Sequence, residues 1–422
     1  MGIFLVIVLG LTAAIHLYLW QRLVRDTTTN RRWRRIGSTA VLAAALVLVG
    51  TLFGGSLLPS RLDWLTAPGY VWLGLMFYLL VALLALELPV LVVATGQWLT
   101  RRFMRRRGAS ADAAGVSSNP ASPAPASTPT ATMTATVAPA TATVPNPGRR
   151  RLLRQGAALV AGVAAVGLSG YGVVRAYGPP VVRRLEVPLT RLDRRADGLR
   201  IAVLGDLHIG PLYGTGQVER VVEMVNALDA DLVTVVGDMV SSEVGAVRES
   251  ALPLRRMRSR YGSYFVTGNH EYYTGHDEWI EAADDLGLRV LRNQRVEIAH
   301  RGGAIDLAGV NDREGVRYDD PADYAAALAD RDPSRPVVLL AHQPVQVREA
   351  AAYGVDLQLS GHTHGGQIVP FNLLVRLDQP VVAGLAEVDG TQIYVTRGAG
   401  FWGPPMRVGA EPEIALIELR AA

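Results

Sequence analysis

Long apolar runs dominate the first part of the chain. Residues 3–20, 36–58 and 70–99 are almost entirely apolar, and a fourth run, residues 156–174, follows a polar segment. Each run is long enough to cross a lipid bilayer as a helix, which takes about 20 residues. None has the amphipathic periodicity of a helix packed in a soluble core. The pattern therefore predicts four transmembrane helices.

Beyond residue 180 the apolar runs become short and rich in β-branched residues. They are residues 199–204, 231–236, 264–267, 337–340 and 355–359. Such runs are typical of strands that are buried on both faces of a parallel sheet. In open α/β sheets the functional loops follow the carboxyl ends of the strands. The pattern predicts an α/β domain in which the loops after these strands meet at one edge.

Side chains with metal-binding chemistry follow each of these short runs. They are Asp206, His208, Asp238, Asn269, His342, His362 and His364. Asp206 and His208 are two residues apart at a strand end, where strand alternation would point both to one side, so that they could chelate one ion together. His362 and His364 have the same spacing, but glycines flank them. Glycine favours tight turns, and such a turn could aim one imidazole at each of two ions.

This ligand set indicates divalent metals and phosphorus chemistry. Carboxylate, imidazole and one amide oxygen suit Mn, Fe or Zn, and the absence of cysteine excludes thiolate sites. A carboxylate such as Asp238 can bridge two cations about 3.5–4 Å apart, and a hydroxide held between them attacks phosphorus in line. The cations would also offset the negative charge that develops. His270 would then protonate the leaving oxygen or stabilise the transition state.

The same residues, taken in order, resemble a known family signature. The pieces are Asp206-x-His208, Gly237-Asp238, Gly268-Asn269-His270-Glu271, His342 and Gly361-His362-Thr363-His364. They are similar to the complete signature of the calcineurin-like metallophosphoesterases, over roughly residues 199–419. The stretch from Arg397 to Pro405, together with the apolar runs upstream, resembles the membrane-anchored subgroup called transmembrane proteins with a metallophosphoesterase domain.

The resemblance implies a fold and a role for each site residue. It implies a four-layer α/β/β/α sandwich and gives His270 the role of the acid. One metal would be held by Asp206, His208, Asp238 and His364. The other would be held by Asp238, Asn269, His342 and His362.

Charge separates the two parts of the chain. All 42 basic residues are arginine; the first 180 residues carry 17 of them and four acidic residues, whereas the rest carries 25 arginines and 34 acidic residues. The acidic catalytic part argues against nucleic acid as the main substrate, because phosphate backbones are bound by basic surfaces. The absence of cysteine excludes disulfides and leaves the compartment open.

The arginines predict an orientation in the membrane. They cluster in residues 22–35 and 101–107, whereas residues 59–69 hold one arginine and one aspartate. By the positive-inside rule, the N-terminus lies outside and both clusters are cytoplasmic. The fourth helix then carries the chain out again, so the sequence predicts a multi-pass protein of the cell membrane with an extracytoplasmic catalytic domain.

Four segments follow from these patterns. Residues 1–107 form a three-helix transmembrane region, and residues 108–148 form a linker rich in Ala, Pro, Ser and Thr that cannot fold. Residues 149–176 combine a basic motif with the fourth helix, and residues 181–422 form the catalytic domain. The basic motif resembles a twin-arginine export signal, but a plain positive-inside anchor explains it equally. No A-x-A cleavage site follows, so we expect the helix to remain as an anchor.

Several residues allow two interpretations. Glu87, in the middle of a predicted transmembrane helix, is either a functional carboxylate or a protonated side chain beside the kink expected at Pro89. Phe401 and Trp402 could touch lipid or pack in the core. We expect His276 and His300 to be ordinary surface histidines, although His276 follows the Gly268–Glu271 motif closely enough to contact substrate.

The sequence thus predicts a membrane-anchored enzyme with two divalent metal ions that hydrolyses phosphoester or pyrophosphate bonds. Its expected partners are the bilayer and a phosphorylated small molecule or a lipid-linked or envelope phosphate, and no protein partner is indicated. A broad phosphodiesterase without lipid preference is the first alternative. The second is a membrane sensor or scaffold that binds without turnover. A transporter is disfavoured because inverted repeats are not visible.

Overall fold

The computed structural model describes residues 2–54, 66–112 and 147–422. Two compact units divide the chain: residues 1–43 with 77–165, and residues 44–76 with 166–422. Most of the expected linker, residues 108–148, lies outside the described residues. At its two ends, however, α3 continues to Asp112 and α4 begins at Pro147.

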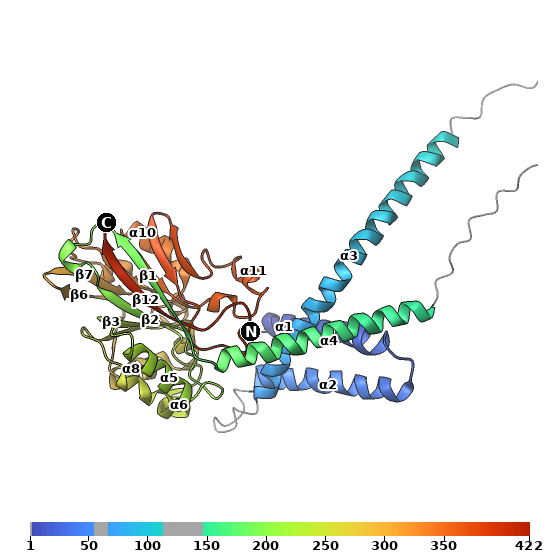
Figure 1. The fold of residues 1–422 in the computed structure, drawn as a ribbon, viewed down its shortest axis with the longest axis horizontal. Helices are drawn as coiled ribbons and strands as arrows, with labels where there is room; N and C mark the ends of the chain where they lie inside the picture. The colour runs from blue at the N-terminus through green and yellow to red at the C-terminus, as the bar shows by residue number, and fades with distance from the viewer. Residues whose placement is uncertain (1, 55–65, 113–146) are drawn as a thin grey trace, which may run out of the picture. The chain divides into compact units, whose positions relative to one another are not determined.

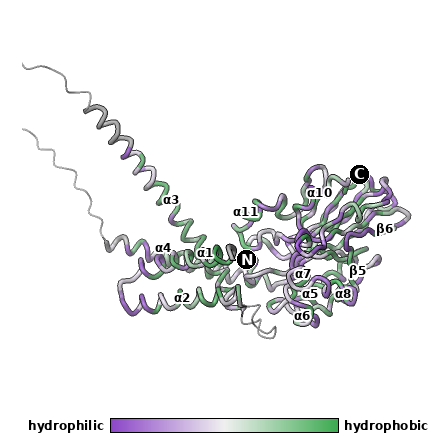
Figure 2. The backbone as a smooth tube through the Cα atoms, turned by 180° about the vertical axis from the view of Figure 1, so that it is seen from behind, coloured by the Kyte–Doolittle hydropathy of each residue, from purple (hydrophilic) through white to green (hydrophobic). Residues whose placement is uncertain are grey.

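Long helices account for the apolar runs in the N-terminal part. They are α1 (Gly2–Trp20), which continues as the π-helical turn η1 (Gln21–Arg25), α2 (Arg31–Gly54), α3 (Ala67–Asp112) and α4 (Pro147–Tyr177). Within the described residues, four segments are long and apolar enough to cross a membrane: Leu5–Arg25, Arg31–Phe53, Ala67–Thr100 and Arg151–Tyr177. Figure 2 shows the hydrophobic stretches along these helices. The four predicted apolar helices are thereby confirmed.

Glu87 has an ionic partner in the first unit that the sequence analysis did not foresee. Its carboxylate accepts a hydrogen bond of 2.7 Å from the guanidinium of Arg22. Arg22 also bonds Asp26 at 3.2 Å, and Arg154 lies 3.4 Å from the other oxygen of Asp26. Arg22 lies just beyond the first apolar run, residues 3–20. Glu87 belongs to this chain of ion pairs.

Two six-stranded sheets form the centre of the second unit (Figure 1). The first sheet has the order β1 (Val181–Leu189), β12 (Glu413–Ala421), β2 (Arg200–Leu204), β3 (Leu232–Val236), β4 (Ser263–Val266) and β5 (Leu288–Val290). The second has the order β10 (Gly384–Val388), β11 (Thr391–Val395), β9 (Leu357–Ser360), β8 (Val337–Leu340), β7 (Gly303–Gly309) and β6 (Gln294–His300). Strands β2, β3, β4 and β5 are parallel, as are β7, β8 and β9.

Helices cover the outer face of each sheet. The helices that follow β1 in the sequence are α5 (Thr215–Asn226), α6 (Val244–Ala251), α7 (Asn269–Thr274), α8 (His276–Asp285), α9 (Tyr324–Ala327), α10 (Val347–Ala352) and α11 (Asn372–Val375). One apolar core joins the first sheet to α5, α6 and α8, and another joins the second sheet to α9 and α10.

A further core fills the space between the sheets and explains the strand pattern. Within β2, Ala202 and Leu204 belong to the helix-side core, whereas Ile201 and Val203 belong to the core between the sheets. Because successive side chains point to opposite faces, a strand buried on both faces must be apolar throughout. The four-layer α/β/β/α sandwich is confirmed. The expected single sheet edge is wrong, since β2, β3 and β4 lie in one sheet and β8 and β9 in the other.

Candidate metal centre

Loops at the ends of strands from both sheets bring the predicted ligands together. The backbone N–H of Asp206 donates to the carbonyl of Gly237 at 3.1 Å, and the N–H of Gly361 donates to the carbonyl of His342 at 3.0 Å. Across the sheets, the N–H of His362 donates to Oδ1 of Asp206 at 2.8 Å. Backbone hydrogen bonds therefore fix the spacing of these loops before any ligand binds.

Glycine is required at Gly237, at the end of β3. Its φ is +83°, and a Cβ there would lie 2.6 Å from Nδ1 of His342 and 2.8 Å from the backbone N of Gly268. A larger residue would be strained and would push apart two of the loops that carry ligands. The Gly-Asp pair thus places Asp238 between its neighbours.

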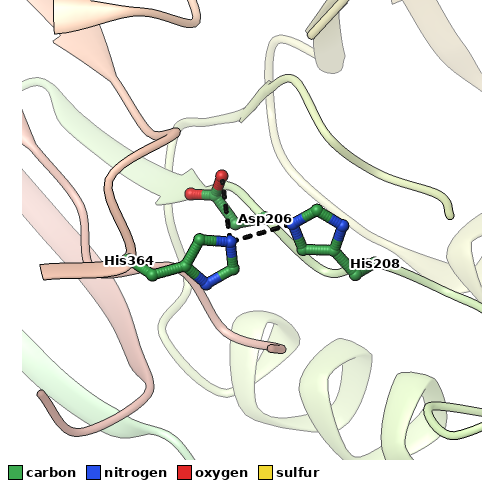
Figure 3. A group of neighbouring side chains, drawn as sticks. All are labelled: Asp206, His208 and His364. Carbon is green, nitrogen blue, oxygen red and sulfur yellow. Dashed lines mark hydrogen bonds and ion pairs between the residues drawn. The ribbon is translucent and has the colours of Figure 1, made fainter. Parts of the chain in front are cut away.

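A first group of candidate ligands consists of Asp206, His208 and His364, all buried (Figure 3). Nε2 of His208 lies 2.9 Å from Nε2 of His364, and that atom lies 3.8 Å from Oδ1 of Asp206. Oδ2 of Asp206 is buried without a hydrogen-bond partner among the described residues. A buried, unpaired carboxylate oxygen facing imidazole nitrogens is costly unless a cation is bound. These atoms fit a divalent metal ion.

A second group lies beside the first and consists of Asp238, His342 and His362. Nε2 of His342 lies 3.2 Å from Oδ2 of Asp238 and 3.2 Å from Oδ1 of Asn269. Nδ1 of His362 lies 2.9 Å from the same oxygen of Asn269. His362 and His364 therefore point into different groups, as their turn predicted.

Asp238 and His270 connect the two groups. Oδ2 of Asp238 lies 3.7 Å from Nε2 of His208, in addition to its contact with His342. The N–H of His270 donates to Oδ1 of Asp238 at 2.9 Å, and its ring centroid lies 4.5 Å from that of His208. The sequence-predicted site residues are thus all brought together, with Asp238 between the two groups.

Further polar groups, which lie outside the sequence motifs, orient the candidate ligands. Nδ1 of His342 lies 2.8 Å from the carbonyl oxygen of Val236. Because a carbonyl can only accept a hydrogen bond, Nδ1 must carry the proton, and in the neutral ring Nε2 is then free to bind a metal ion. Oγ of Ser241 lies 2.8 Å from Nδ1 of His208. The buried Arg407 donates to the carbonyl of His364 at 2.8 Å and lies 3.0 Å from its Nδ1. No spacing rule links Ser241 or Arg407 to the signature.

Glu271 holds the loop that carries Asp238. Its carboxylate is fully buried and accepts hydrogen bonds from the backbone N–H groups of Gly268 at 2.6 Å, Asp238 at 3.0 Å and Val240 at 3.2 Å. The fourth residue of the Gly268–Glu271 motif is therefore a support for the site.

Burial and charge set the protonation of the candidate ligands. Burial lowers the pKa of His208 and of His364 well below the ordinary value, and Arg407 adds to this at His364. Burial also lowers the pKa of His362, to about 4. These rings are neutral at pH 7, the form that binds metals. Burial acts against both charges of the Asp238 and His342 pair, yet their attraction raises the pKa of His342 and lowers that of Asp238.

The structure corrects the reason that brings Asp206 and His208 together. Both have a φ of 51°, in the left-handed region, so they do not alternate as strand residues. Their loop turns sharply after β2, and this turn directs both side chains into one group. Asp238 and His364 also have a φ of 51°. Strain of this kind is typical of functional sites.

Two histidines and two aromatic residues that allowed more than one interpretation, His276, His300, Phe401 and Trp402, have defined surroundings in the structure. His300 is not a surface residue: it is 1% exposed, and its Nδ1 lies 3.0 Å from Oη of Tyr261. His276 stacks on Tyr272, with ring centroids 4.7 Å apart, and belongs to neither ligand group. Phe401 packs in the core against Tyr177 and Tyr213, whereas Trp402 is 56% exposed.

A cavity of about 720 Å³ opens beside the ligands. Its lining includes His208, Ser241, His270, Tyr273 and Trp402. Leu52 and Tyr70, which belong to the same compact unit, line it too. His270 therefore faces a space that can hold a substrate.

Comparison with known proteins agrees with this architecture. The profile of the family described as "Calcineurin-like phosphoesterase" matches residues 199–366. A Helicobacter pylori protein named "Uncharacterized metallophosphoesterase" is 40% identical over 276 residues, which cover 65% of this chain and 73% of that protein. The chain belongs to the calcineurin-like metallophosphoesterases. This family uses divalent metals.

Other relatives of this metallophosphoesterase include two that are named as transmembrane proteins. A zebrafish protein named "Transmembrane protein with metallophosphoesterase domain" is 40% identical over 276 residues, 63% of this chain. The chain spans 62% of that relative and 64% of its bovine counterpart. An Aquifex aeolicus metallophosphoesterase is 33% identical over 61% of this chain and 97% of its own length. With its four apolar helices, the metallophosphoesterase is a membrane protein.

Proposed function

We propose that this metallophosphoesterase hydrolyses a phosphoester or pyrophosphate bond at a site for two divalent metal ions. The ligands would be Asp206, His208, Asp238, Asn269, His342, His362 and His364. One observation carries the proposal: Oδ2 of Asp238 lies 3.2 Å from His342 and 3.7 Å from His208, so one carboxylate serves both ligand groups. Mn, Zn and Fe all suit this mixture of imidazole, carboxylate and amide.

The protein positions the ligand side chains and sets the protonation of His270. Bound divalent ions would polarise the phosphoryl group and provide the nucleophile at neutral pH. Hydrogen bonds accepted by Glu271 and by the carbonyl of Val236 hold the loops and the ring of His342 in place, and Ser241 holds the ring of His208. Burial lowers the pKa of His270, so its ring is neutral at pH 7. A neutral imidazole can still donate an N–H hydrogen bond to the leaving oxygen, and the ring lines the substrate cavity.

We further propose that the substrate is a lipid-linked or envelope phosphate. The cavity that includes His208 and His270 is also lined by Leu52 and Tyr70, which lie in two of the candidate membrane spans. Only three residues separate the end of α4, Tyr177, from the first residue of β1, Val181. Both facts support a substrate whose phosphate lies near a bilayer. A broad phosphodiesterase without lipid preference is the alternative.

The proposed orientation places the catalytic unit outside the cytoplasm, in accord with the arginines of residues 22–35 and 101–107. The chain has no cysteine, so single cysteines report position cleanly. A cysteine at the exposed Glu387 of the catalytic unit should react with a membrane-impermeant maleimide on intact cells. A cysteine at the exposed Thr29, between α1 and α2, should react only after lysis. The opposite labelling pattern would reverse the orientation.

The proposed chemistry is tested with the full chain in detergent, loaded with Mn. Hydrolysis of bis-p-nitrophenyl phosphate and p-nitrophenyl phosphate would be compared with that of a phosphate ester of a lipid in mixed micelles. We expect Asp238→Asn to abolish hydrolysis and His270→Ala to lower kcat by about 10²–10⁴, the usual contribution of a general acid. The exposed Asp277→Asn serves as the matched control. Full activity in Asp238→Asn would refute the proposal, and equal turnover of all substrates would favour the broad phosphodiesterase.

A further inference from the structure

The second unit has an exposed apolar surface beside the candidate metal centre. Leu373, Leu374 and Leu377 are 60%, 57% and 83% exposed. They lie on α11 and just after it, and we call them the α11 surface. Leu373 and Leu377 are four residues apart, and Leu374 and Leu377 are three apart, so a helical turn groups them on one side. Soluble proteins seldom expose neighbouring large apolar side chains without a binding role.

This surface is joined rigidly to the metal-site loop. A Cβ on Gly366 would lie 2.7 Å from the backbone N of Asn372, so the first residue of α11 packs directly on the loop that carries His364. Gln367, the next residue, donates to the carbonyl of Trp402 at 2.7 Å and accepts from its N–H at 3.0 Å. Hydrogen bonds and backbone packing thus connect both the α11 surface and the exposed Trp402 to the loop of residues 364–367.

Residues 406–408, which follow Trp402 in the chain, contact two of the candidate membrane-spanning helices within the second unit. The N–H of Arg407 donates to the carbonyl of Gly172, in α4, at 2.9 Å. A Cβ on Gly172 would lie 2.9 Å from Cγ2 of Val408, and one on Gly74, in α3, would lie 2.9 Å from Cε of Met406. Residues 406–408 therefore pack closely on both helices.

Residues 406–408 in turn pair with the chain that enters α11. The N–H of Val408 donates to the carbonyl of Gln367 at 2.9 Å, and the N–H of Val369 donates to the carbonyl of Val408 at 2.9 Å. Gly172 lies five residues before Tyr177, the end of α4, which is about 7.5 Å along a helix. The α11 surface is therefore linked to the last turns of α4, whose Tyr171 and Val174 are also exposed.

We propose that the α11 surface inserts into the lipid surface of the membrane that holds the chain's own helices. Interfacial segments bury their apolar side by about 5–10 Å at the boundary of head groups and acyl chains, which is the depth expected at the last turns of a spanning helix. Trp402 and Tyr171 are of the types enriched at that boundary. Insertion would hold the catalytic cavity against the lipid. The inference rests on the proposed membrane anchoring and not on turnover.

The test uses the full, cysteine-free chain with single cysteines that carry an environment-sensitive fluorophore. The protein is reconstituted in phosphatidylcholine and phosphatidylglycerol vesicles with nitroxide-labelled acyl chains. Leu377→Cys probes the α11 surface, and Val163→Cys, 65% exposed within α4, is the positive control. Glu387→Cys is the negative control, because β10 adjoins the far end of β1: Gln392, in the paired strand, donates to the carbonyl of Pro188 at 2.7 Å. Strand β1 has nine residues, which span roughly 30 Å at about 3.3 Å each.

We expect the probes at Leu377 and Val163 to lose most of their fluorescence to the nitroxide lipids, and the probe at Glu387 to lose almost none. Quenching at Val163 without quenching at Leu377 would overturn the inference while leaving the anchoring intact. A Leu377 probe that is shielded from water but not quenched would indicate that a second copy of this chain covers the surface and would also overturn the inference. Absence of quenching at Val163 would overturn the anchoring and the inference together.

Discussion

Arg407 offers the sharpest test of how the metal-site loops are held. Its side chain is 1% exposed and has no carboxylate partner at salt-bridge distance among the described residues. The guanidinium donates from Nε to the carbonyl of Gly400 at 2.9 Å and from another nitrogen to the carbonyl of His364 at 2.8 Å. Burial lowers the pKa of Arg407 to about 10, so the group remains charged at pH 7. One side chain thus connects two loops.

The expected cost follows from the carbonyls that would lose their donors. Arg407→Met leaves the carbonyl of Gly400 buried and unpaired, whereas the carbonyl of His364 keeps the N–H of Gln367 at 3.0 Å, so the change should cost about 1–3 kcal/mol of unfolding free energy. Arg407→Lys keeps the charge but has fewer donors and lacks the planar fork, so its ammonium group should reach only one of the two carbonyls. For a domain of this size about 1 kcal/mol shifts Tm by roughly 2–4 °C. Loss of support for a ligand histidine should also weaken metal binding by about 10–100-fold.

The assay measures Tm by intrinsic fluorescence and metal affinity by competition with a chelating dye, both on the full chain in detergent. Arg420→Met is the matched control, because Arg420 is a partly exposed arginine whose ion pairs lie at the surface. That change should cost no more than about 1 kcal/mol and leave metal affinity unchanged. If Arg407→Met behaved like Arg420→Met in both measurements, Arg407 would not hold the two loops together.

Three further predictions address other parts of the molecule. In Glu271→Gln the side-chain amide turns an N–H donor toward backbone N–H groups that donate to Glu271, so the change should lower the unfolding free energy by about 1–3 kcal/mol. The control, Glu278→Gln at an exposed position, should leave Tm unchanged. Equal effects of the two changes on Tm would contradict the prediction. In the metal-free protein, Asp238 raises the pKa of His342 above its usual value, so metal must displace a proton there. Affinity should fall as pH falls below that raised pKa, and calorimetry in two buffers at pH 7 should detect proton release; none would refute this account. Glu87→Gln removes the negative charge that pairs with Arg22 and should lower Tm without changing hydrolysis. Lost hydrolysis would contradict this and assign Glu87 a role in activity.

The fold and the ligand residues could be predicted because their signals are local. Strands buried on both faces must be apolar throughout, so the short runs that end near Asp206, Asp238 and His342 were visible one by one. The division of those strands between two sheets was not visible in the runs. It depends on strand order, and only the family resemblance implied it.

The contacts that hold the site could not be predicted from spacing. Arg407 meets His364 across 43 residues, and Arg22 meets Glu87 across 65. Nothing in the intervening sequence signals either pair, because both depend on tertiary packing. The geometry at Asp206 and His208 was also missed, since a period of two assumes extended backbone and both residues adopt a positive φ.

The most direct test of the central claim is the metal content of the full chain, measured beside that of Asp238→Asn. Both proteins would be loaded with Mn, freed of excess metal, and analysed by inductively coupled plasma mass spectrometry together with hydrolysis of bis-p-nitrophenyl phosphate. We predict two ions per chain in the native protein, and fewer ions with no hydrolysis after Asp238→Asn. A single ion in a fully active native protein, or unchanged metal content and activity after Asp238→Asn, would contradict a two-metal site shared through Asp238.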